Sequence, residues 1–139
     1  MTPTQIIESF WRTFAAGDIE AAFSRHMTAD CEMVMPGAPP MRGEKQLRAM
    51  FEAYVTAFPD FAARTLHAVE SGDTHAAETS FSGTHRGPLA TPRGTLPPTG
   101  NRVTWQSADV VRFRDGKIAS WHIYHDTLPL LAQLGVAQG

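Results

Sequence analysis

The pattern of apolar positions divides the chain into a helical N-terminal part and a C-terminal part with the character of strands. Over residues 3–16 the apolar side chains recur at intervals of three and four, which predicts one amphipathic helix whose buried stripe is Ile6, Ile7, Phe10, Trp11 and Phe14. Thr2 or Thr4 is expected to cap this helix, and Gly17 to end it. Asp18 is then placed to cap a short second helix over residues 19–26.

A brief strand over residues 31–35 is predicted next, because Pro36 and Gly37 stop it. The segment 37–43 is expected to be a loop. A third helix is predicted over residues 44–58, with Leu47, Met50, Phe51, Tyr54 and Phe58 on one side.

Alternating patterns in the second half predict strands over residues 61–70 and 75–86. Residues 87–101 contain four prolines and three glycines, so we expect a long loop without regular structure, of the kind that often forms a functional lid or mouth. Two further strands are predicted on either side of Asp115-Gly116, a strong hairpin signal. Residues 127–136 are expected to form a short helix or turn.

This order of elements is typical of an α+β fold in one domain, residues 1–139. The expected architecture is a curved sheet, mixed or antiparallel, with helices packed across its concave face. Such an arrangement leaves a cone-shaped apolar cavity, which is the usual place for a small-molecule site.

The strand before the Asp-Gly turn presents an unusual face. Its side chains are apolar except for one serine and one carboxylate (Val103, Trp105, Ser107, Asp109, Val111 and Phe113). In an apolar cavity the pKa of Asp109 would be raised, which suits a general acid or base near neutral pH. The alternative is a structural carboxylate that is held by an arginine or by backbone N–H groups.

Composition narrows the range of partners. The formal net charge is -2 and the basic residues are scattered, which argues against binding to nucleic acid or to an anionic membrane. Cys31 is the single cysteine, which favours a reducing, cytoplasmic location and a buried, unreactive thiol. The sequence has neither the pattern of a signal peptide nor an apolar run of membrane-spanning length. His122 and His125 would lie on opposite faces of a strand, so we expect no metal site and no cofactor.

Short segments along nearly the whole chain carry a family resemblance. They are AAGD at 15–18, PG at 36–37, RG at 42–43, AFPD at 57–60, GTHRG at 83–87, PTG at 98–100, DVVRFRDGKI at 109–118, YHD at 124–126 and QLG at 133–135. With these segments the chain resembles the SnoaL-like polyketide cyclases, and the resemblance implies the NTF2-like fold. Because the shared segments are mostly structural, they indicate the fold better than the reaction.

The resemblance also implies where a site would lie. Aromatic polyketide cyclases of this family close a ring by an intramolecular aldol reaction, using an aspartate on the last strand whose position here is Ile123. The family's partner histidine falls at Asp109, its helical tyrosine at Phe14, and its cavity asparagines at Met35 and Met50. The implied cavity is more apolar than usual, so the aldol mechanism does not transfer intact.

Several further residues are candidates for the same cavity. His125 and Trp121 share the face of Ile123, and His125 is either a proton-transfer group or a hydrogen-bonded histidine at the rim. His85 either polarises a substrate oxygen or braces the loop that follows it. Asp126 is either catalytic or the N-cap of residues 127–130. We expect Tyr54 and Trp105 to contact substrate.

The sequence therefore predicts a cofactor-free enzyme that cyclises or isomerises an apolar, oxygenated, polyketide-like or steroid-like molecule. Asp109 would move a proton, with His125 and His85 assisting. If Asp109 is instead part of a buried structural pair, we expect the shape of the cavity to be what mainly guides the cyclisation. Two alternatives are an epoxide hydrolase of the same fold and a non-catalytic module for ligand binding or dimerisation. In every case we expect a homodimer through the open sheet face.

Overall fold

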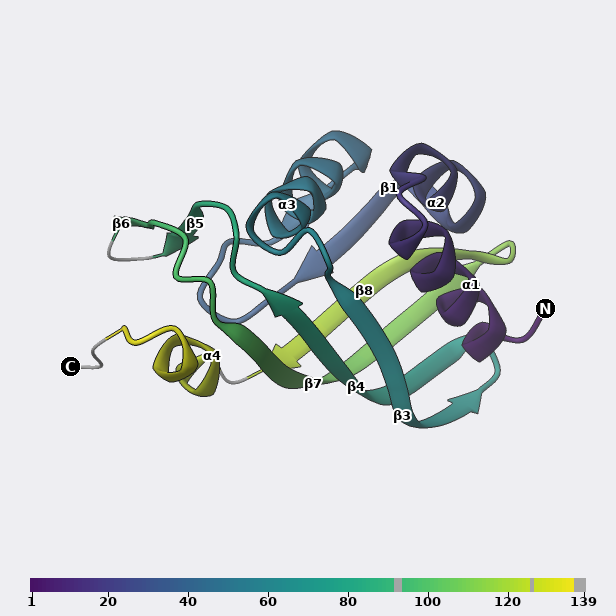
Figure 1. The fold of residues 1–139 in the computed structure, drawn as a ribbon. Helices are drawn as coiled ribbons and strands as arrows, with labels where there is room; N and C mark the ends of the chain where they lie inside the picture. The colour runs from purple at the N-terminus through teal and green to yellow at the C-terminus, as the bar shows by residue number, and fades with distance from the viewer. Residues whose placement is uncertain (92–93, 126, 137–139) are drawn as a thin grey trace.

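A curved six-stranded sheet with helices on one face forms the body of the molecule (Figure 1). The computed structural model describes residues 1–91, 94–125 and 127–136. The helices are α1 (Pro3–Ala15), α2 (Ile19–His26), α3 (Glu44–Ala57) and α4 (Leu128–Gln133). The strands are β1 (Met27–Val34), β2 (Met41–Arg42), β3 (Ala62–Ser71), β4 (Thr74–Thr84), β5 (Leu89–Thr91), β6 (Gly94–Leu96), β7 (Arg102–Arg114) and β8 (Lys117–His125).

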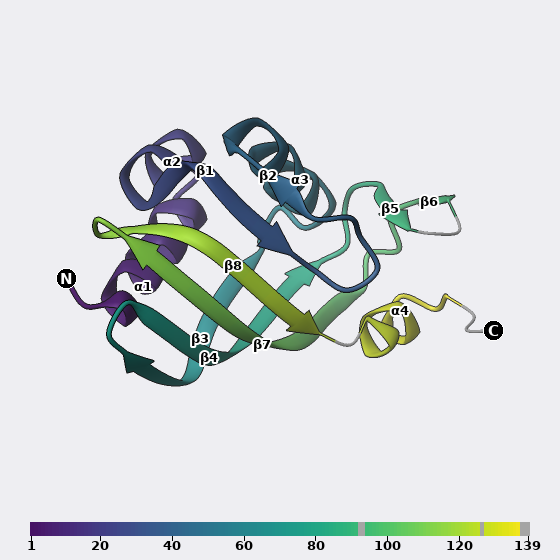
Figure 2. The same ribbon diagram turned by 180° about the vertical axis from the view of Figure 1, so that it is seen from behind.

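The sheet runs in the order β2-β1-β8-β7-β4-β3. All neighbouring strands are antiparallel except β1 and β8, which are parallel. Helices α1, α2 and α3 lie on the concave side of the sheet, whereas no described helix lies over the opposite face (Figure 2). The α+β class and the concave, helix-covered sheet are therefore confirmed.

Local signals explain how α1 and α2 begin. Thr2 and Gln5 form a capping box, in which each side chain accepts a hydrogen bond from the other residue's backbone N–H. Asp18 caps α2 by accepting a hydrogen bond from the N–H of Ala21 at 2.9 Å. The stripe on α1 packs against the sheet, where the ring of Phe10 lies 5.5 Å from that of Trp121. Each large buried aromatic of this kind contributes roughly 1.5–3 kcal/mol of hydrophobic free energy.

Strand β7 alternates between buried and exposed side chains along its whole length. Its inner face holds the predicted apolar set, and Asp109 lies on that face with Trp105 and Phe113. Asp109 is directly opposite Ile123 on β8 and Ala77 on β4. The predicted placement of this carboxylate on the concave side is thus correct.

Several predicted bounds and one predicted loop need correction, beyond differences of one or two residues at the ends of α1, β3 and β4. Strand β1 begins at Met27 rather than residue 31, because its early residues pair in parallel with β8. Met41–Arg42 form β2 within the predicted loop, and α3 ends at Ala57, one residue early. Residues 87–101 are not free of regular structure, since β5 and β6 pair as a hairpin.

A side-chain hydrogen bond joins the paired strands β5 and β6. The Thr91 hydroxyl donates to the carbonyl of Gly94 at 2.7 Å, and Gly94 adopts a φ of 111°, which only glycine reaches without strain. Strands of three residues are too short to show an alternating pattern, so the prolines and glycines around them dominate the sequence signal. Among the described residues, no helix has the length and apolar character required to cross a bilayer.

Candidate functional site

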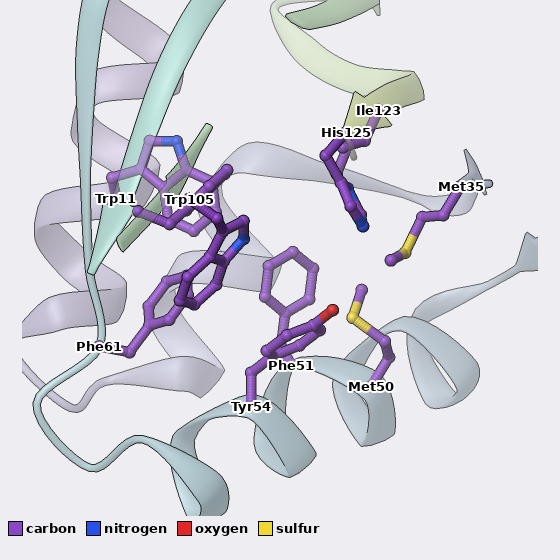
Figure 3. Close-up of a pocket in the computed structure, with 10 residues that line it drawn as sticks. Trp11, Met35, Met50, Phe51, Tyr54, Phe61, Trp105, Ile123 and His125 are labelled. Atoms are coloured by element: carbon purple, nitrogen blue, oxygen red, sulfur yellow. The ribbon is translucent and has the colours of Figure 1, made fainter. Parts of the chain in front are cut away.

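An apolar chamber lies between the helices and the concave face of the sheet (Figure 3). Its walls come from α1, α3, β4, β7, β8 and the segments next to them, and its lining residues are Trp11, Met35, Met50, Phe51, Tyr54, Phe61, Phe81, Trp105, Ile123 and His125. Helical spacing places Met50, Phe51 and Tyr54 on one side of α3. Alternation along β8 places Ile123 and His125 on its inner face.

The chamber is narrow. Its cavity volume is only about 30 Å³, and the empty space that includes its open mouth is about 380 Å³. Aromatic rings occupy much of the remaining space; the rings of Phe81 and Trp105, for example, stack with centroids 5.5 Å apart. A ligand larger than a few atoms therefore requires side chains at the mouth to move.

The described lining residues His125, Tyr54 and Trp105 bring polar groups to the chamber. Figure 3 shows the imidazole of His125 and the hydroxyl of Tyr54 directed toward the space beside Met35 and Met50, and the indole nitrogen of Trp105 on the other side of the Phe51 ring. Burial raises the pKa of Tyr54, so its phenol stays protonated at neutral pH and remains a hydrogen-bond donor. An imidazole that transfers protons beside two fixed donors is a suitable arrangement for chemistry next to a carbonyl group.

Asp109 lies beneath the chamber rather than in its lining. The carboxylate is 3% exposed and accepts hydrogen bonds from the hydroxyl of Ser107 and, at 3.2 Å, from the indole N–H of Trp121. Burial raises the pKa of Asp109 more than these two donors lower it. Among the described residues, neither an arginine nor a backbone N–H group is bound to the carboxylate, so the partners there differ from those of the predicted structural alternative.

Ser107 connects the buried carboxylate to the chamber wall. It is paired directly with His125 across β7 and β8, and both side chains face inward. Side chains in such pairs have Cβ atoms about 4.5–5.5 Å apart. The side chain of Ser107 therefore lies between the buried carboxylate of Asp109 and the imidazole of His125, which faces the chamber.

The structure divides the predicted site residues into two groups. Met35, Met50, Tyr54, Trp105, Ile123 and His125 line the chamber. Phe14, Trp121, His85 and Asp109 are buried outside its lining, and Asp126 lies outside the described residues. The sequence analysis missed Phe61 and Phe81 as lining residues, and it assigned Trp11 and Phe51 to the core. The inward position of Phe81 on β4 was a signal that could have identified it.

His85 connects β4 to the segment before β7. Its Nδ1 accepts a hydrogen bond from the N–H of Thr99 at 3.1 Å, which places the proton of the neutral ring on Nε2. The backbone of His85 also pairs with Asn101 and Gly100. These contacts match the bracing role that was weighed for this histidine.

Cysteine and metal chemistry find little support in the described part of the chain. Burial raises the pKa of the Cys31 thiol to about 12, so the reactive thiolate is scarce at neutral pH. Within residues 1–91, 94–125 and 127–136, no three His, Cys, Asp or Glu side chains are grouped so that they could hold a metal ion.

The comparisons with known proteins agree with this architecture. The family model for SnoaL-like polyketide cyclases matches residues 5–134, so the chain belongs to the SnoaL-like polyketide cyclase family. A search of curated protein sequences finds no significant match.

Solved structures with the same fold cover almost the whole chain. IdmH of Streptomyces antibioticus, described as a candidate polyketide cyclase, is 26% identical, with a TM-score of 0.80 and coverage of 98% of this chain and 100% of its own. TsrD of Streptomyces laurentii is 25% identical, with a TM-score of 0.82 and coverage of 96% and 95%. SalBIII, an epoxide hydrolase/cyclase-like enzyme of pyran-ring formation in salinomycin, is 21% identical, covers 91% and 92%, and has a TM-score of 0.75, which shows the fold alone.

Proposed function

We propose that this protein is a cofactor-independent cyclase or isomerase that acts on an apolar, oxygenated, polyketide-like molecule in the chamber. The main support is that His125 and Tyr54 are directed toward one space, in a chamber that Trp105 also lines and whose other lining is mostly apolar. Such a chamber holds the substrate in a folded shape, which brings its reacting atoms together. Membership of the SnoaL-like family is consistent with ring closure.

His125 is the proposed proton-transfer group, because it faces the chamber whereas Asp109 does not. In an aldol closure, His125 would remove a proton from the carbon next to a carbonyl group. The Tyr54 hydroxyl and the Trp105 N–H would donate hydrogen bonds to the oxygen that gains negative charge. Asp109 would act as a positioning residue, because it accepts the hydrogen bond of Ser107 and so orients that hydroxyl beside His125.

A non-catalytic binding module is the second candidate, and the narrow chamber favours it. Trp121 is fully buried, so it does not supply an exposed aromatic side chain to a dimer interface of such a module. An epoxide hydrolase is less well supported, because that reaction uses a carboxylate with an oriented water, and no Asp or Glu is among the described residues of the chamber lining.

Ring closure of a phenyl-substituted 1,5-diketone tests the proposal: aldol addition gives a β-hydroxycyclohexanone, which loses one water molecule to give a cyclohexenone, and both products are measured by chromatography. We expect His125→Phe to lower the rate at least 100-fold, in line with the ~10²–10⁴-fold effect of general acid–base catalysis. His122→Phe is the matched control, since this histidine lies on the other face of β8. Binding of the diketone without any turnover would favour the binding module. A rate within about twofold of wild type in His125→Phe would exclude the proposed role of this histidine.

We also propose that the chain forms a homodimer through the outer face of the sheet. Val110 and Tyr124 lie on the neighbouring strands β7 and β8, with 37% and 54% of their surface exposed. Light scattering tests this, with Tyr124→Lys expected to shift a dimer toward monomer. A monomeric mass for the wild type at micromolar concentration would exclude the dimer.

A further inference from the structure

A second cavity lies beside the chamber, between α3 and the hairpin of β5 and β6. We call it the hairpin groove; among its lining residues are Met50, Ala53 and Tyr54 from α3 and Leu89, Ala90 and Thr95 from the hairpin. Figure 1 shows β5 next to α3, at the end of the molecule away from the N-terminus. The groove has a volume of about 450 Å³, compared with about 30 Å³ for the chamber.

The groove and the chamber have two lining residues in common. Met50 and Tyr54 line both spaces, so these two side chains lie between the groove and the chamber. Met50 is unbranched and has three rotatable bonds, and such side chains adapt readily to a ligand. A movement of Met50 would therefore join the two spaces without any change in the backbone.

We propose that the hairpin groove binds an uncharged hydrocarbon or ring extension of the same substrate whose reacting end occupies the chamber. This inference rests on the proposed function. The volumes support it, because the chamber alone is far below the roughly 300–1,000 Å³ of pockets that hold drug-sized ligands. The chemistry supports it too, since the described lining of the groove contains hydroxyl groups but no charged side chain.

Binding of a series of 4-alkylphenols tests the proposal. The phenol ring would enter the chamber beside Tyr54 and His125, and the alkyl chain would extend into the groove. Affinity, measured by quenching of tryptophan fluorescence, should rise about fourfold for each added methylene from ethyl to hexyl, as expected when each CH₂ is buried.

Ala53→Phe is designed to fill the groove, because Ala53 is exposed and lines the groove but not the chamber. This variant should bind 4-hexylphenol at least about tenfold more weakly while binding of 4-ethylphenol stays within about twofold. Ala90→Phe should do the same from the opposite wall. Ala49→Phe is the matched control, since it lies one turn earlier on α3, is also exposed, and lines neither space.

The outcomes separate this inference from the proposed function. Affinity that does not rise with chain length in the wild type, or that is unchanged in both groove variants, would overturn the assignment of the groove alone. A loss in Ala49→Phe equal to that in Ala53→Phe would overturn it as well. A wild type that does not bind 4-ethylphenol would exclude the chamber as a ligand site, and with it both proposals.

Discussion

Trp121 donates its indole N–H to the carboxylate of Asp109 at 3.2 Å, across the two central strands β7 and β8. Both residues had been candidates for direct contact with substrate. Their hydrogen bond instead lies beneath the chamber, where Ser107 provides the second donor. The carboxylate therefore lies in the interior with two neutral donors, and burial raises its pKa more than these donors lower it.

The Asp109→Asn variant should reveal the protonation of this buried group. Because its pKa is raised in the folded state, the stability that Asp109 contributes is complete below the unfolded pKa and is lost as pH rises through the folded pKa. We expect the wild type to gain stability relative to the variant as pH falls from about 8 to about 4. Urea unfolding of both proteins across this range measures the difference. A difference that does not change with pH would show that Asp109 titrates normally.

Loss of the hydrogen bond from Ser107 to Asp109 should destabilise the fold. Ser107→Ala leaves one carboxylate oxygen without its partner, and we expect a cost of about 1–3 kcal/mol in the free energy of unfolding. Ser80→Ala, on the outward side of β4, is the matched control and should change stability by less than about 0.5 kcal/mol. Chemical denaturation measures both. Equal effects of the two substitutions would mean that the Ser107 hydrogen bond contributes nothing specific.

The sequence predicted those parts of the fold whose signals are local or strictly periodic. Every second residue of β7 is buried, so alternation alone placed Asp109 on the concave face. Thr2 and Asp18 lie directly before the helices that they cap, which is why the first residues of α1 and α2 could be predicted from the sequence. The parallel pairing of β1 with β8 joins residues about ninety positions apart, and no local pattern encodes it.

The candidate site was predictable only in part, because the strand face of a side chain does not determine whether that side chain reaches the chamber or is buried beneath it. Trp121, Ile123 and His125 all point inward from β8, yet only the last two line the chamber. The difference depends on how α1 covers the sheet, where Phe10 packs on Trp121. The aromatic lining from Phe61 and Phe81 likewise results from the tertiary packing of separate elements.

Acidification should weaken the anchor of α1 on the sheet. The ring of His75 is buried, and its Nδ1 lies 3.1 Å from the hydroxyl of Thr4, which itself donates to Glu70. Burial lowers the pKa of His75 more than the nearby carboxylates Glu70 and Glu8 raise it. The folded state therefore binds this proton less tightly than the unfolded chain, so stability should fall as pH drops through the ordinary value of 6.5.

Thermal unfolding at a series of pH values tests this prediction. The His75→Gln variant should lose part of the decrease below about pH 6.5, although its stability at neutral pH is also expected to be lower. His67→Gln is the matched control, because His67 is exposed on β3. If the wild type and His75→Gln show the same dependence on pH, His75 does not cause it.

A methyl group added at Gly87 should distort the wall of the hairpin groove. A Cβ there would collide with the carbonyl oxygen of Thr56, at the end of α3, and the N–H of Gly87 donates to the carbonyl of Ala57 at 3.2 Å. Gly87→Ala must therefore push the start of the hairpin away from α3, at a cost of about 1–3 kcal/mol or more. Gly72→Ala is the control, since it adds a methyl group in open space and tests only the strain at a φ of 57°. We expect weaker binding of 4-hexylphenol in Gly87→Ala but not in Gly72→Ala; equal binding in the two would show that the contact of Gly87 with α3 does not shape the groove.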